Sequence, residues 1–193
     1  MDFIDLFSGL GGFHVGLSRA GGNCVFASEK NHTLRKLYER NFNLFCHGDI
    51  SDIPASIIPE HDILCAGFPC QPFSKAGEQD GLNDVRGNLF YEISRILEYH
   101  NPKYFILENV PNLLTHDNGN TFSVIKHELE NKLNYKIKYE ILSPHEHGIP
   151  QIRKRIFIIG SRDHNVIDAF KFPVKSKKET SIKSILDKKE YPS

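Results

Sequence analysis

The fold of this chain is decided by one stretch near its beginning, Phe3-Ile4-Asp5-Leu6-Phe7-Ser8-Gly9-Leu10-Gly11-Gly12-Phe13. Its first five residues form a short, mostly apolar run typical of a buried strand, and the glycines after them predict a tight turn. A helical pattern begins directly after the turn, at His14. A strand, a glycine turn and a helix N-terminus bring free backbone N–H groups together. This arrangement favours a negatively charged or hydrogen-bonding ligand group.

An acidic residue, Glu29, lies twenty positions after Gly9, just past the second predicted strand. In a doubly wound sheet, an acid at this distance can accept hydrogen bonds from the hydroxyl pair of a ribose. The nicotinamide-dinucleotide fingerprint requires a third glycine at position 14, which is His14 here. The pattern therefore disfavours a dinucleotide and indicates a cofactor that resembles a mononucleoside. A tight turn beside one solvated glutamate is the alternative that the glycines alone leave open.

Short apolar runs alternate with longer amphipathic segments along the rest of the chain, which predicts an α/β domain with a mostly parallel sheet. The predicted strands are Phe3–Phe7, Cys24–Ala27, Ile63–Ala66, Tyr104–Leu107, Tyr135–Leu142 and Arg155–Gly160. The predicted helices are His14–Ala20, His32–Arg40, Asn88–Tyr99 and Thr121–Lys132, the last one capped by Asn120. Residues 70–86 form a polar segment without a period, and a loop of that length in a compact domain is usually functional or mobile.

The composition, with 39% hydrophobic and 25% charged residues among 193, indicates one well-buried soluble domain. The formal net charge is zero, which argues against strong DNA binding by this chain alone, although the stretch from Lys171 onward is lysine-rich. No apolar run is long enough for a membrane span, and the beginning lacks the features of a secretory signal. The four cysteines show no paired metal spacing, and Cys65, inside a predicted strand, is expected to be an inert core residue. We therefore expect a cytoplasmic protein, or a nuclear one if the source is eukaryotic.

A second informative stretch, Gly67-Phe68-Pro69-Cys70-Gln71-Pro72-Phe73-Ser74, leaves the carboxyl end of a predicted buried strand. In open α/β sheets, ligands bind at that edge. Pro69 and Pro72 restrict the backbone around Cys70, so that its thiol is held by a stiff turn. A free thiol has a pKa of roughly 8.5, so a nucleophilic Cys70 needs a second group that makes its attack favourable.

Together these two stretches closely resemble the DNA cytosine-5 methyltransferase family. Two further blocks match it in order, Leu107-Glu108-Asn109-Val110 and Gly148-Ile149-Pro150-Gln151-Ile152-Arg153-Lys154-Arg155. The resemblance runs from Phe3 to about Gly160. It implies the α/β fold of class I S-adenosylmethionine-dependent methyltransferases, a Rossmann-like, mostly parallel sheet flanked by helices. We expect this catalytic domain to span residues 1–170, with residues 171–193 as a lysine-rich exit segment toward an absent target-recognition region.

For catalysis, the resemblance implies methyl transfer from S-adenosyl-L-methionine to C5 of a cytosine in double-stranded DNA, in a restriction-modification or related system. Cys70 matches the family's thiolate, which adds to C6 of the base. Glu108 matches the acid at N3, protonated while it is bound to the base, and a desolvated pocket favours that state. Arg155 matches the group that contacts O2. Arg153 alternates with Arg155 along a predicted strand, so that one of the two is expected to face away and serve as a structural or phosphate contact. The base must also be flipped out of the duplex.

The resemblance further implies the cofactor contacts. Phe7, Ser8, Gly9 and Gly11 of the turn contact the methionine moiety, and Glu29 binds the ribose. Asp49, with Ile50 beside it, holds the adenine amino group. Two further segments line the pocket, Gly67 with Pro69 and Asn88 with Leu89. We expect no metal, because His145-Glu146-His147 offers two histidines without further ligands.

The chain departs from the family pattern in two places. Ser143-Pro144-His145-Glu146-His147 replaces an asparagine-containing segment, and no counterpart of the family's target-recognition domain or of its final helix with a Gly-Asn-containing motif follows. We therefore expect a complementary polypeptide to carry these parts, and apolar surface around Phe3–Phe13 and the first helix to be open. We also expect the chain to be close to inactive alone.

Three other functions were considered beside DNA methylation. A relative that acts on RNA, as one tRNA-methylating branch of the family does, would share the same motifs. A non-catalytic remnant that binds a cofactor or a partner is disfavoured by the intact set of Cys70, Glu108 and Arg155. A thiol-dependent or nicotinamide enzyme on a similar sheet is disfavoured by His14 and by the block from Gln151 to Arg155.

Overall fold

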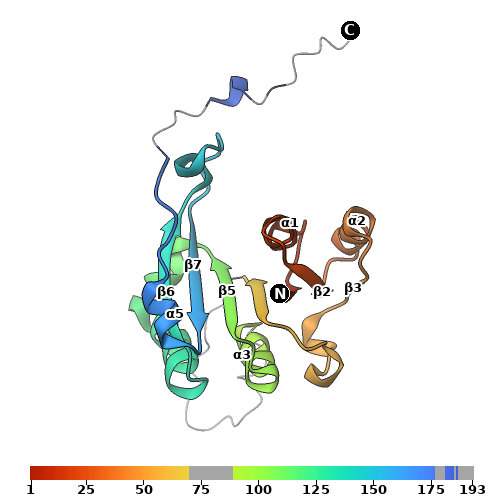
Figure 1. Ribbon diagram of the computed structural model, residues 1–193, viewed down its shortest axis with the longest axis vertical. Coiled ribbons are helices and arrows are strands. Elements are labelled where there is room, and N and C mark those ends of the chain that lie inside the picture. The colour runs from red at the N-terminus through yellow and green to blue at the C-terminus, as the bar shows by residue number, and fades with distance from the viewer. Residues whose placement is uncertain (70–88, 177–180, 185, 187–193) are drawn as a thin grey trace.

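The apolar runs form the strands of a single sheet in the computed structural model, which describes residues 1–69, 89–176, 181–184 and 186. The strands are β1 Asp2–Leu6, β2 Asn23–Ser28, β3 Cys46–His47, β4 Ile63–Gly67, β5 Tyr104–Asn109, β6 Lys136–Leu142 and β7 Arg155–Ser161. The helices are α1 Gly12–Arg19, α2 His32–Phe42, α3 Leu89–His100, α4 Asn120–His127 and α5 His164–Ala169 (Figure 1). The mostly parallel α/β fold predicted from the sequence is confirmed.

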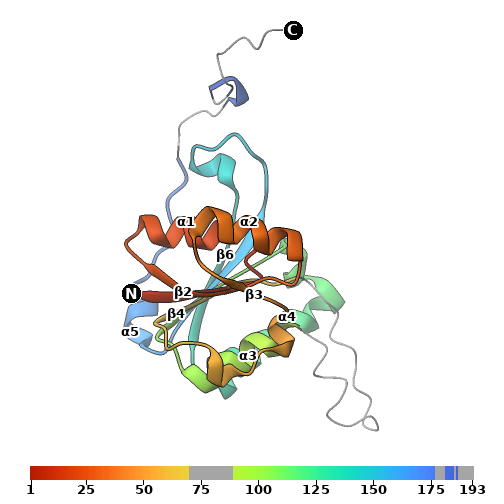
Figure 2. The same ribbon diagram turned by 90° about the vertical axis from the view of Figure 1, so that its right-hand side faces the viewer.

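The seven strands lie in the order β3-β2-β1-β4-β5-β7-β6, and pairing is parallel from β3 through β5. Strand β7 runs antiparallel to β5 and to β6. Helices α1 and α2 lie on one face of the sheet, and α3 and α4 lie on the other (Figure 2). The strand order reverses between β1 and β4. Ligands of open α/β sheets bind at such a switch point, outside the carboxyl ends of the strands.

The predicted elements are all present, with shifted ends. Phe7 lies outside its strand because its backbone turns into the left-handed region, with φ of 54°. Strand β3 was not predicted, since two residues are too short to show a period. Helix α5 was not predicted either, although Asp163 caps it by accepting hydrogen bonds from the N–H groups of Asn165 and Val166.

The predicted fourth helix ends at Lys132 as predicted, but its cap and the type of its last turn differ from the prediction. Asn120 is not the cap but the first helical residue, because Gly119, with φ of 86°, supplies the non-helical backbone that a cap requires. After His127 the helix widens into a π-helical turn, Glu128–Lys132. In this turn the buried Glu128 accepts a hydrogen bond of 2.8 Å from the Ser94 hydroxyl of α3. The spacing of apolar residues in the sequence does not reveal that Glu128 has a hydrogen-bond partner on another helix.

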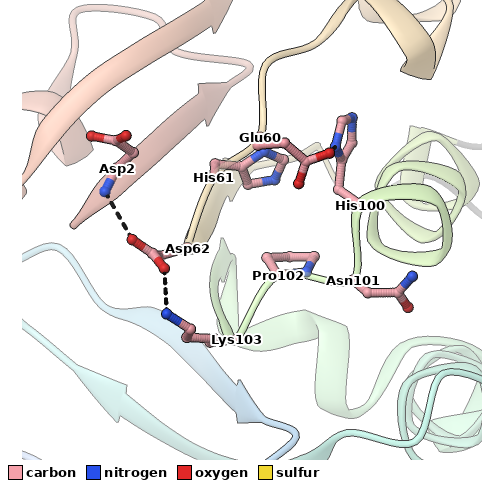
Figure 3. A pocket seen from close by; sticks show the side chains of 8 residues that line it. All are labelled: Asp2, Glu60, His61, Asp62, His100, Asn101, Pro102 and Lys103. Carbon is pink, nitrogen blue, oxygen red and sulfur yellow. Dashed lines mark hydrogen bonds and ion pairs between the residues drawn. The ribbon is translucent and has the colours of Figure 1, made fainter.

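The amino ends of β1, β4 and β5 border a polar hollow of about 350 Å³ (Figure 3). His61 and His100 lie side by side there, with ring centroids 4.9 Å apart, and each ring contacts a backbone carbonyl, of Pro59 and Ala55 respectively. Lys103 pairs with Asp62 at 2.8 Å on the exposed rim. This hollow lies at the edge of the sheet opposite to the one where the sequence places the site.

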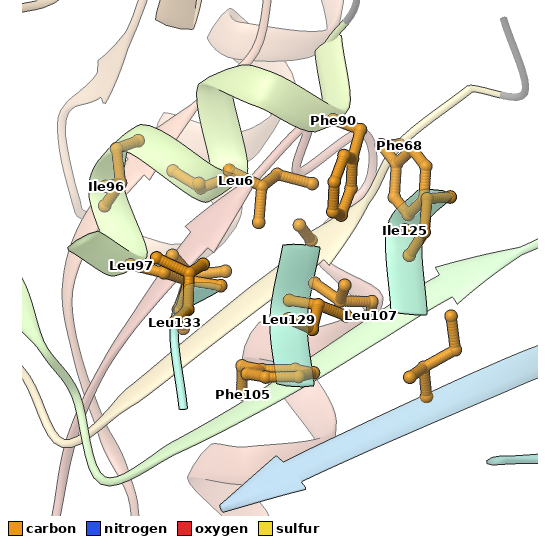
Figure 4. Close-up of a cluster of buried hydrophobic side chains, with 14 of the residues drawn as sticks. Leu6, Phe68, Phe90, Ile96, Leu97, Phe105, Leu107, Ile125, Leu129 and Leu133 are labelled. Carbon is orange, nitrogen blue, oxygen red and sulfur yellow. The ribbon is translucent and has the colours of Figure 1, made fainter. Parts of the chain in front are cut away.

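The main hydrophobic core lies between the sheet and helices α3 and α4 (Figure 4). We call this side the closed face. Its strands contribute fully buried side chains, namely Ile4, Leu6, Leu64, Phe105, Leu107, Ile156 and Ile158. The other side, the open face, holds a smaller cluster of Phe3, Ile63 and Cys65, against which Phe13 and Leu17 of α1 pack. The expectation that Cys65 is a core residue is confirmed, since it is fully buried.

Candidate functional site

The glycine turn between β1 and α1 has an unusual backbone. Phe7, Gly9 and Gly11 all have positive φ, at 54°, 52° and 81°. Positive φ is uncommon for a bulky residue such as phenylalanine. Gly11 is required for a second reason, because a Cβ atom there would overlap the Phe42 ring. The turn is therefore shaped by close packing against α2 as well as by its own flexibility.

Glu29 lies directly after β2 and holds the turn in place. One of its carboxylate oxygens accepts a hydrogen bond of 3.0 Å from Gly9 N–H, and the other accepts one of 2.8 Å from Asn31 N–H. Each carboxylate oxygen has a further lone pair, so Glu29 retains the capacity to accept hydrogen bonds from a ligand.

Asp49 lies beyond Glu29, next to Lys30. Lys30 Nζ is 2.8 Å from Asp49 Oδ2, and this hydrogen bond lowers the pKa of the Asp49 carboxyl below its ordinary value. The other Asp49 oxygen accepts a hydrogen bond from Ser51 N–H. The next residue, Ile50, is buried in the main core. Any ligand that reaches the Asp49 carboxylate would therefore share it with Lys30.

A buried amide, Asn109, connects the ends of β4 and β5. Its Nδ2 donates to the carbonyl oxygen of Phe68 at 2.9 Å, and its Oδ1 accepts from Val110 N–H at 2.8 Å. The bond to Phe68 fixes the backbone that leads into Pro69. Sequence reasoning quoted Asn109 within a motif but assigned it no part in the site. Its position next to Glu108 at a strand end was the available signal.

Glu108 and Arg155 face each other across the β5–β7 pair. Arg155 Nε lies 2.9 Å from Glu108 Oε1, and each side chain is about one-fifth exposed, at 21% and 23%. Gly67 lies beside them, and a Cβ atom there would be 3.4 Å from Glu108 Oε2. A partly buried acid and a guanidinium at the carboxyl edge form a pair that can donate and accept hydrogen bonds along the edge of a planar ligand.

The prediction that one of Arg153 and Arg155 faces away was wrong, because residues two apart along a strand share a face and because only Arg155 lies in a strand. Strand β7 begins at Arg155, so Arg153 lies in the preceding loop and is not subject to strand alternation. Its N–H donates to the Ser143 hydroxyl at 3.1 Å. Both arginines line the same pocket as Glu108.

One pocket of about 410 Å³ collects most of the predicted site at the switch point. It is lined by Phe7, Glu29, Lys30, Gly67, Phe68, Pro69, Leu89, Glu108, Asn109, Val110, Arg153 and Arg155. The structure does not bring Ser8, Gly9, Gly11, Asp49 or Ile50 into its lining. Ser8 is nearly buried, with its hydroxyl 3.6 Å from Cys46 Sγ. The predicted residues Cys70 and Asn88 lie outside the described residues.

A second, more apolar hollow of about 290 Å³ adjoins this pocket and shares Glu108, Arg153 and Arg155 with it. Its other walls are Leu142, Ser143, Pro144, His147, Ile149 and Phe157. Phe157 belongs to the open face of the sheet, where Tyr104, Ile106 and Ile159 are also only half-buried. The expectation of open apolar surface around the first motif and first helix is confirmed for the exposed Leu10 and Val15. It was wrong for Phe3, which is fully buried under α1. Further half-buried apolar surface lies along the open face of the sheet.

The described ranges, residues 1–69, 89–176, 181–184 and 186, also bear on other classes of protein. In those ranges, no three histidine, cysteine or acidic side chains converge in a way that could hold a metal ion. None of the helices described there has the length and apolar character that crossing a membrane requires.

The sequence matches one protein family over its whole length and curated proteins over most of it. The family described as C-5 cytosine-specific DNA methylase matches residues 1–193. The Type II methyltransferase M.HhaI of Haemophilus parahaemolyticus is 45% identical over 184 residues, covering 95% of this chain and 56% of its own length. The Type II methyltransferase M.HaeII of Haemophilus aegyptius is 48% identical over 184 residues, covering 95% and 57%. The chain thus spans about half the length of the curated relatives it matches.

Solved structures agree on the fold. The S. pombe Dnmt2 methyltransferase superposes with a TM-score of 0.72 at 22% identity, covering 99% of this chain and 62% of that one. A mutant of Spodoptera frugiperda DNMT2 gives a TM-score of 0.71 at 24% identity, with 98% and 60% coverage. At these identities the likeness establishes the fold alone.

Proposed function

Because this chain belongs to the C-5 cytosine-specific DNA methylase family, we propose that it carries the catalytic residues of an S-adenosylmethionine-dependent enzyme that methylates cytosine in double-stranded DNA. The observation that carries the proposal is the meeting of Glu108 and Arg155 beside Pro69, at the switch point of the sheet. Pro69 directly precedes Cys70, so the proposed nucleophile follows a residue that lines the same pocket.

The residues of the pocket fit the proposed cofactor. Phe7 offers an apolar ring and Glu29 a carboxylate at the carboxyl ends of β1 and β2. Gly67 has no side chain, so the space next to the Glu108 carboxylate stays open; a Cβ atom at Gly67 would contact Glu108 Oε2. S-adenosylmethionine would supply an electrophilic methyl group there. Glu29 would accept hydrogen bonds from the ribose hydroxyls, and Phe7 would contact the apolar part of the cofactor.

The target cytosine would react in steps that residues of this chain promote. The Cys70 thiolate adds to C6 of the cytosine, which places negative charge on the ring. Glu108, as a protonated acid, donates a hydrogen bond at N3 as this charge develops, and Arg155 donates to O2. C5 then takes the methyl group from the sulfonium of S-adenosylmethionine, which would leave as S-adenosylhomocysteine. A base removes the C5 proton, and the bond between C6 and the Cys70 sulfur breaks to release the thiolate. Because Arg155 and Glu108 are paired at 2.9 Å, an entering base must rearrange that pair.

A base can reach this pocket only after it leaves the stack, so the proposal includes base flipping. The curated relatives are named as Type II methyltransferases, which favours DNA and a restriction-modification context over RNA. The 24 lysine and arginine residues are balanced by 24 acidic residues, so the chain has no net positive charge to attract phosphates, and we propose that further protein surface holds the duplex.

We propose that this further surface is a complementary segment, in the same or a second polypeptide, that carries the target-recognition part. Two observations support it. None of the eight residues of α1 is buried; Val15 within it and Leu10 shortly before it are exposed. Tyr104, Ile106, Phe157 and Ile159 form half-buried apolar surface on the open face. Apolar surface of this kind usually marks an interface. Residues 171–176 would lead toward that segment, and Lys175 pairs there with Glu146.

Mechanism-based trapping tests the proposed function. The chain, alone and with a co-expressed polypeptide that spans the remaining half of the relatives, is incubated with S-adenosylmethionine and DNA containing 5-fluorocytosine. Fluorine at C5 cannot leave as a proton does, so a covalent complex should accumulate in the assembled protein. Cys70→Ala should abolish the complex, whereas Cys65→Ala, a matched change of a buried thiol, should retain it.

Three outcomes would each contradict one part of the proposal. Equal trapping by Cys70→Ala would remove Cys70 as the nucleophile. Trapping on 5-fluorocytosine RNA with none on DNA would replace the proposed substrate. Strong, sequence-specific methylation by the 193-residue chain alone would remove the need for a complementary segment.

A further inference from the structure

A chain of three polar groups, two of them buried, lies directly behind the glycine turn. His14 Nδ1 of α1 is 2.7 Å from the Tyr38 hydroxyl of α2, and that hydroxyl donates to Asp5 Oδ2 of β1 at 3.4 Å. With Tyr38 as donor to Asp5, the His14 ring must donate to the Tyr38 oxygen. Tyr38 and Asp5 are buried, at 0% and 1% exposure. Buried groups linked in this way strengthen one another's hydrogen bonds.

The same residues form the steric support of the turn. The His14 ring stacks on Phe42 at a centroid distance of 3.9 Å, and the Tyr38 ring lies 4.6 Å from Phe42. Gly11 packs against both α2 rings, because a Cβ atom there would overlap Phe42 and come within 3.0 Å of Tyr38. The backbone of α1 contributes too, since the N–H of His14 lowers the pKa of the Asp5 carboxyl. Strand, turn and both helices therefore meet at Tyr38.

The electrostatic environment makes the Asp5 carboxyl responsive to pH. Burial raises its pKa to about 7, Tyr38 and the His14 N–H act against that rise, and Glu29 adds to it. Its Oδ1 atom is buried without a hydrogen-bond partner among the described residues. Burial raises the pKa values of the neighbouring Cys24, Cys46 and Cys65 thiols above the ordinary value. Burial also lowers the pKa of the His14 imidazole below its ordinary value of 6.5. Asp5 is therefore the acid in this cluster that changes charge near pH 7, whereas His14 changes charge at lower pH.

We propose that His14, Tyr38 and Asp5 are positioning residues for methyl transfer, a hydrogen-bond relay that holds the turn Ser8–Gly11 in the shape that receives the cofactor. The proposal rests on the proposed function for the identity of that ligand. It also explains why position 14 carries a histidine, where a dinucleotide-binding turn carries glycine: the imidazole spans from α1 to α2 and joins the two helices across the turn.

The sharpest test compares two buried tyrosines. Tyr38→Phe removes the hydroxyl and keeps the ring that supports Gly11. Tyr135→Phe is the matched control, because Tyr135 is 1% exposed and its hydroxyl donates to Pro102 O at 2.7 Å in the core of the closed face. Amide hydrogen exchange of the 193-residue chain without any ligand is measured first. Ser8, Gly9 and Gly11 report on the turn, since their N–H groups bond to Ser28 O, Glu29 and Ser8 O.

The relay predicts that Tyr38→Phe accelerates exchange at these amides by roughly tenfold, while Tyr135→Phe leaves them unchanged at a similar loss of thermal stability. Affinity for S-adenosylhomocysteine, by calorimetry on the assembled protein, should fall roughly five- to tenfold for Tyr38→Phe only. It should also rise by roughly two- to fivefold between pH 6 and pH 8 in the wild type, because an ionised Asp5 accepts hydrogen bonds more strongly. Asp5→Asn should remove this pH dependence.

Each result has one meaning. Unchanged exchange in Tyr38→Phe, or equal acceleration in Tyr135→Phe, would overturn the relay, since the residues would then be ordinary core. If Tyr38→Phe accelerates exchange but the assembled wild-type protein binds no S-adenosylhomocysteine, the relay is supported and only the proposed function is contradicted. A pH dependence that persists in Asp5→Asn would remove Asp5 from the relay.

Discussion

The two faces of the sheet differ in what holds them together. On the closed face, β1, β4, β5 and β7 present fully buried aliphatic and aromatic side chains to α3 and α4. On the open face, α1 buries none of its residues, and a polar cluster of Asp5, Tyr38 and His14 takes the place of a dry core near the turn. Stability is therefore concentrated on the side away from the cofactor turn, and the site is assembled on the side that retains polar groups and open surface. Active sites are commonly built at a cost in local stability.

Adjacent isoleucines on β7 test this difference most strongly. Ile158 is fully buried on the closed face, and its neighbour Ile159 is half-buried on the open face. Ile158→Ala should lower the free energy of unfolding by about 2–5 kcal/mol, because it leaves a cavity that the core cannot fill. Ile159→Ala should cost about 1 kcal/mol or less. Urea denaturation measures both, and equal losses would mean that the open face is as well packed as the closed one.

A second prediction concerns the acids beside the turn. Glu29→Ala should weaken S-adenosylhomocysteine binding by roughly ten- to a hundredfold, since a charged acceptor and its bond to Gly9 N–H are both lost. Asp49→Ala should also weaken it, by a smaller factor, because Asp49 already pairs with Lys30 and does not line the pocket. Calorimetry with Asp168→Ala, a distant exposed acid, supplies the control. Full affinity in both variants would place the cofactor elsewhere.

The pH dependence of stability sharpens the comparison further. The folded-state pKa of Asp5, about 7, lies above its ordinary value of 3.8, so the folded protein holds a proton that the unfolded chain has released. That contribution is fully present below pH 3.8 and is lost as pH rises through about 7. Unfolding free energy should thus fall by up to about 2 kcal/mol between pH 5 and pH 7 relative to Asp5→Asn. Parallel pH profiles of the two proteins would show that Asp5 ionises normally.

The smallest effect is expected at the amino edge of the sheet. Lys103 and Asp62 form an exposed ion pair, and exposed pairs contribute little to stability. Lys103→Ala should leave the denaturation midpoint and the Ser8, Gly9 and Gly11 exchange rates unchanged within error. A clear loss of stability would mean that this edge has a structural role that its exposure does not indicate.

Much of the fold was predictable because its signals are local. The apolar runs marked six of the seven strands, and the glycines with Phe7 marked the turn at the switch point. The predictions of secondary structure that failed did so for physical reasons. Strand β3 is too short to show a period, and the π turn at Glu128 depends on Ser94 of another helix. Arg153 was expected to continue the strand of Arg155, and only the pairing of β7 with β6, which starts at Arg155, reveals that the strand does not extend back to Arg153.

By itself, the sequence determined the family, the α/β fold and the residue types at the carboxyl edge of the sheet, because motif order and strand periodicity are properties of the chain read in one dimension. Only the tertiary structure decided which of those residues meet. It pairs Glu108 with Arg155, places Arg153 in the same pocket, and buries Ile50 in the hydrophobic core. It also joined Asp5, His14 and Tyr38, which come from a strand and two helices and have no motif in common. Such contacts depend on the register and packing of distant elements, and nothing local in the chain encodes them.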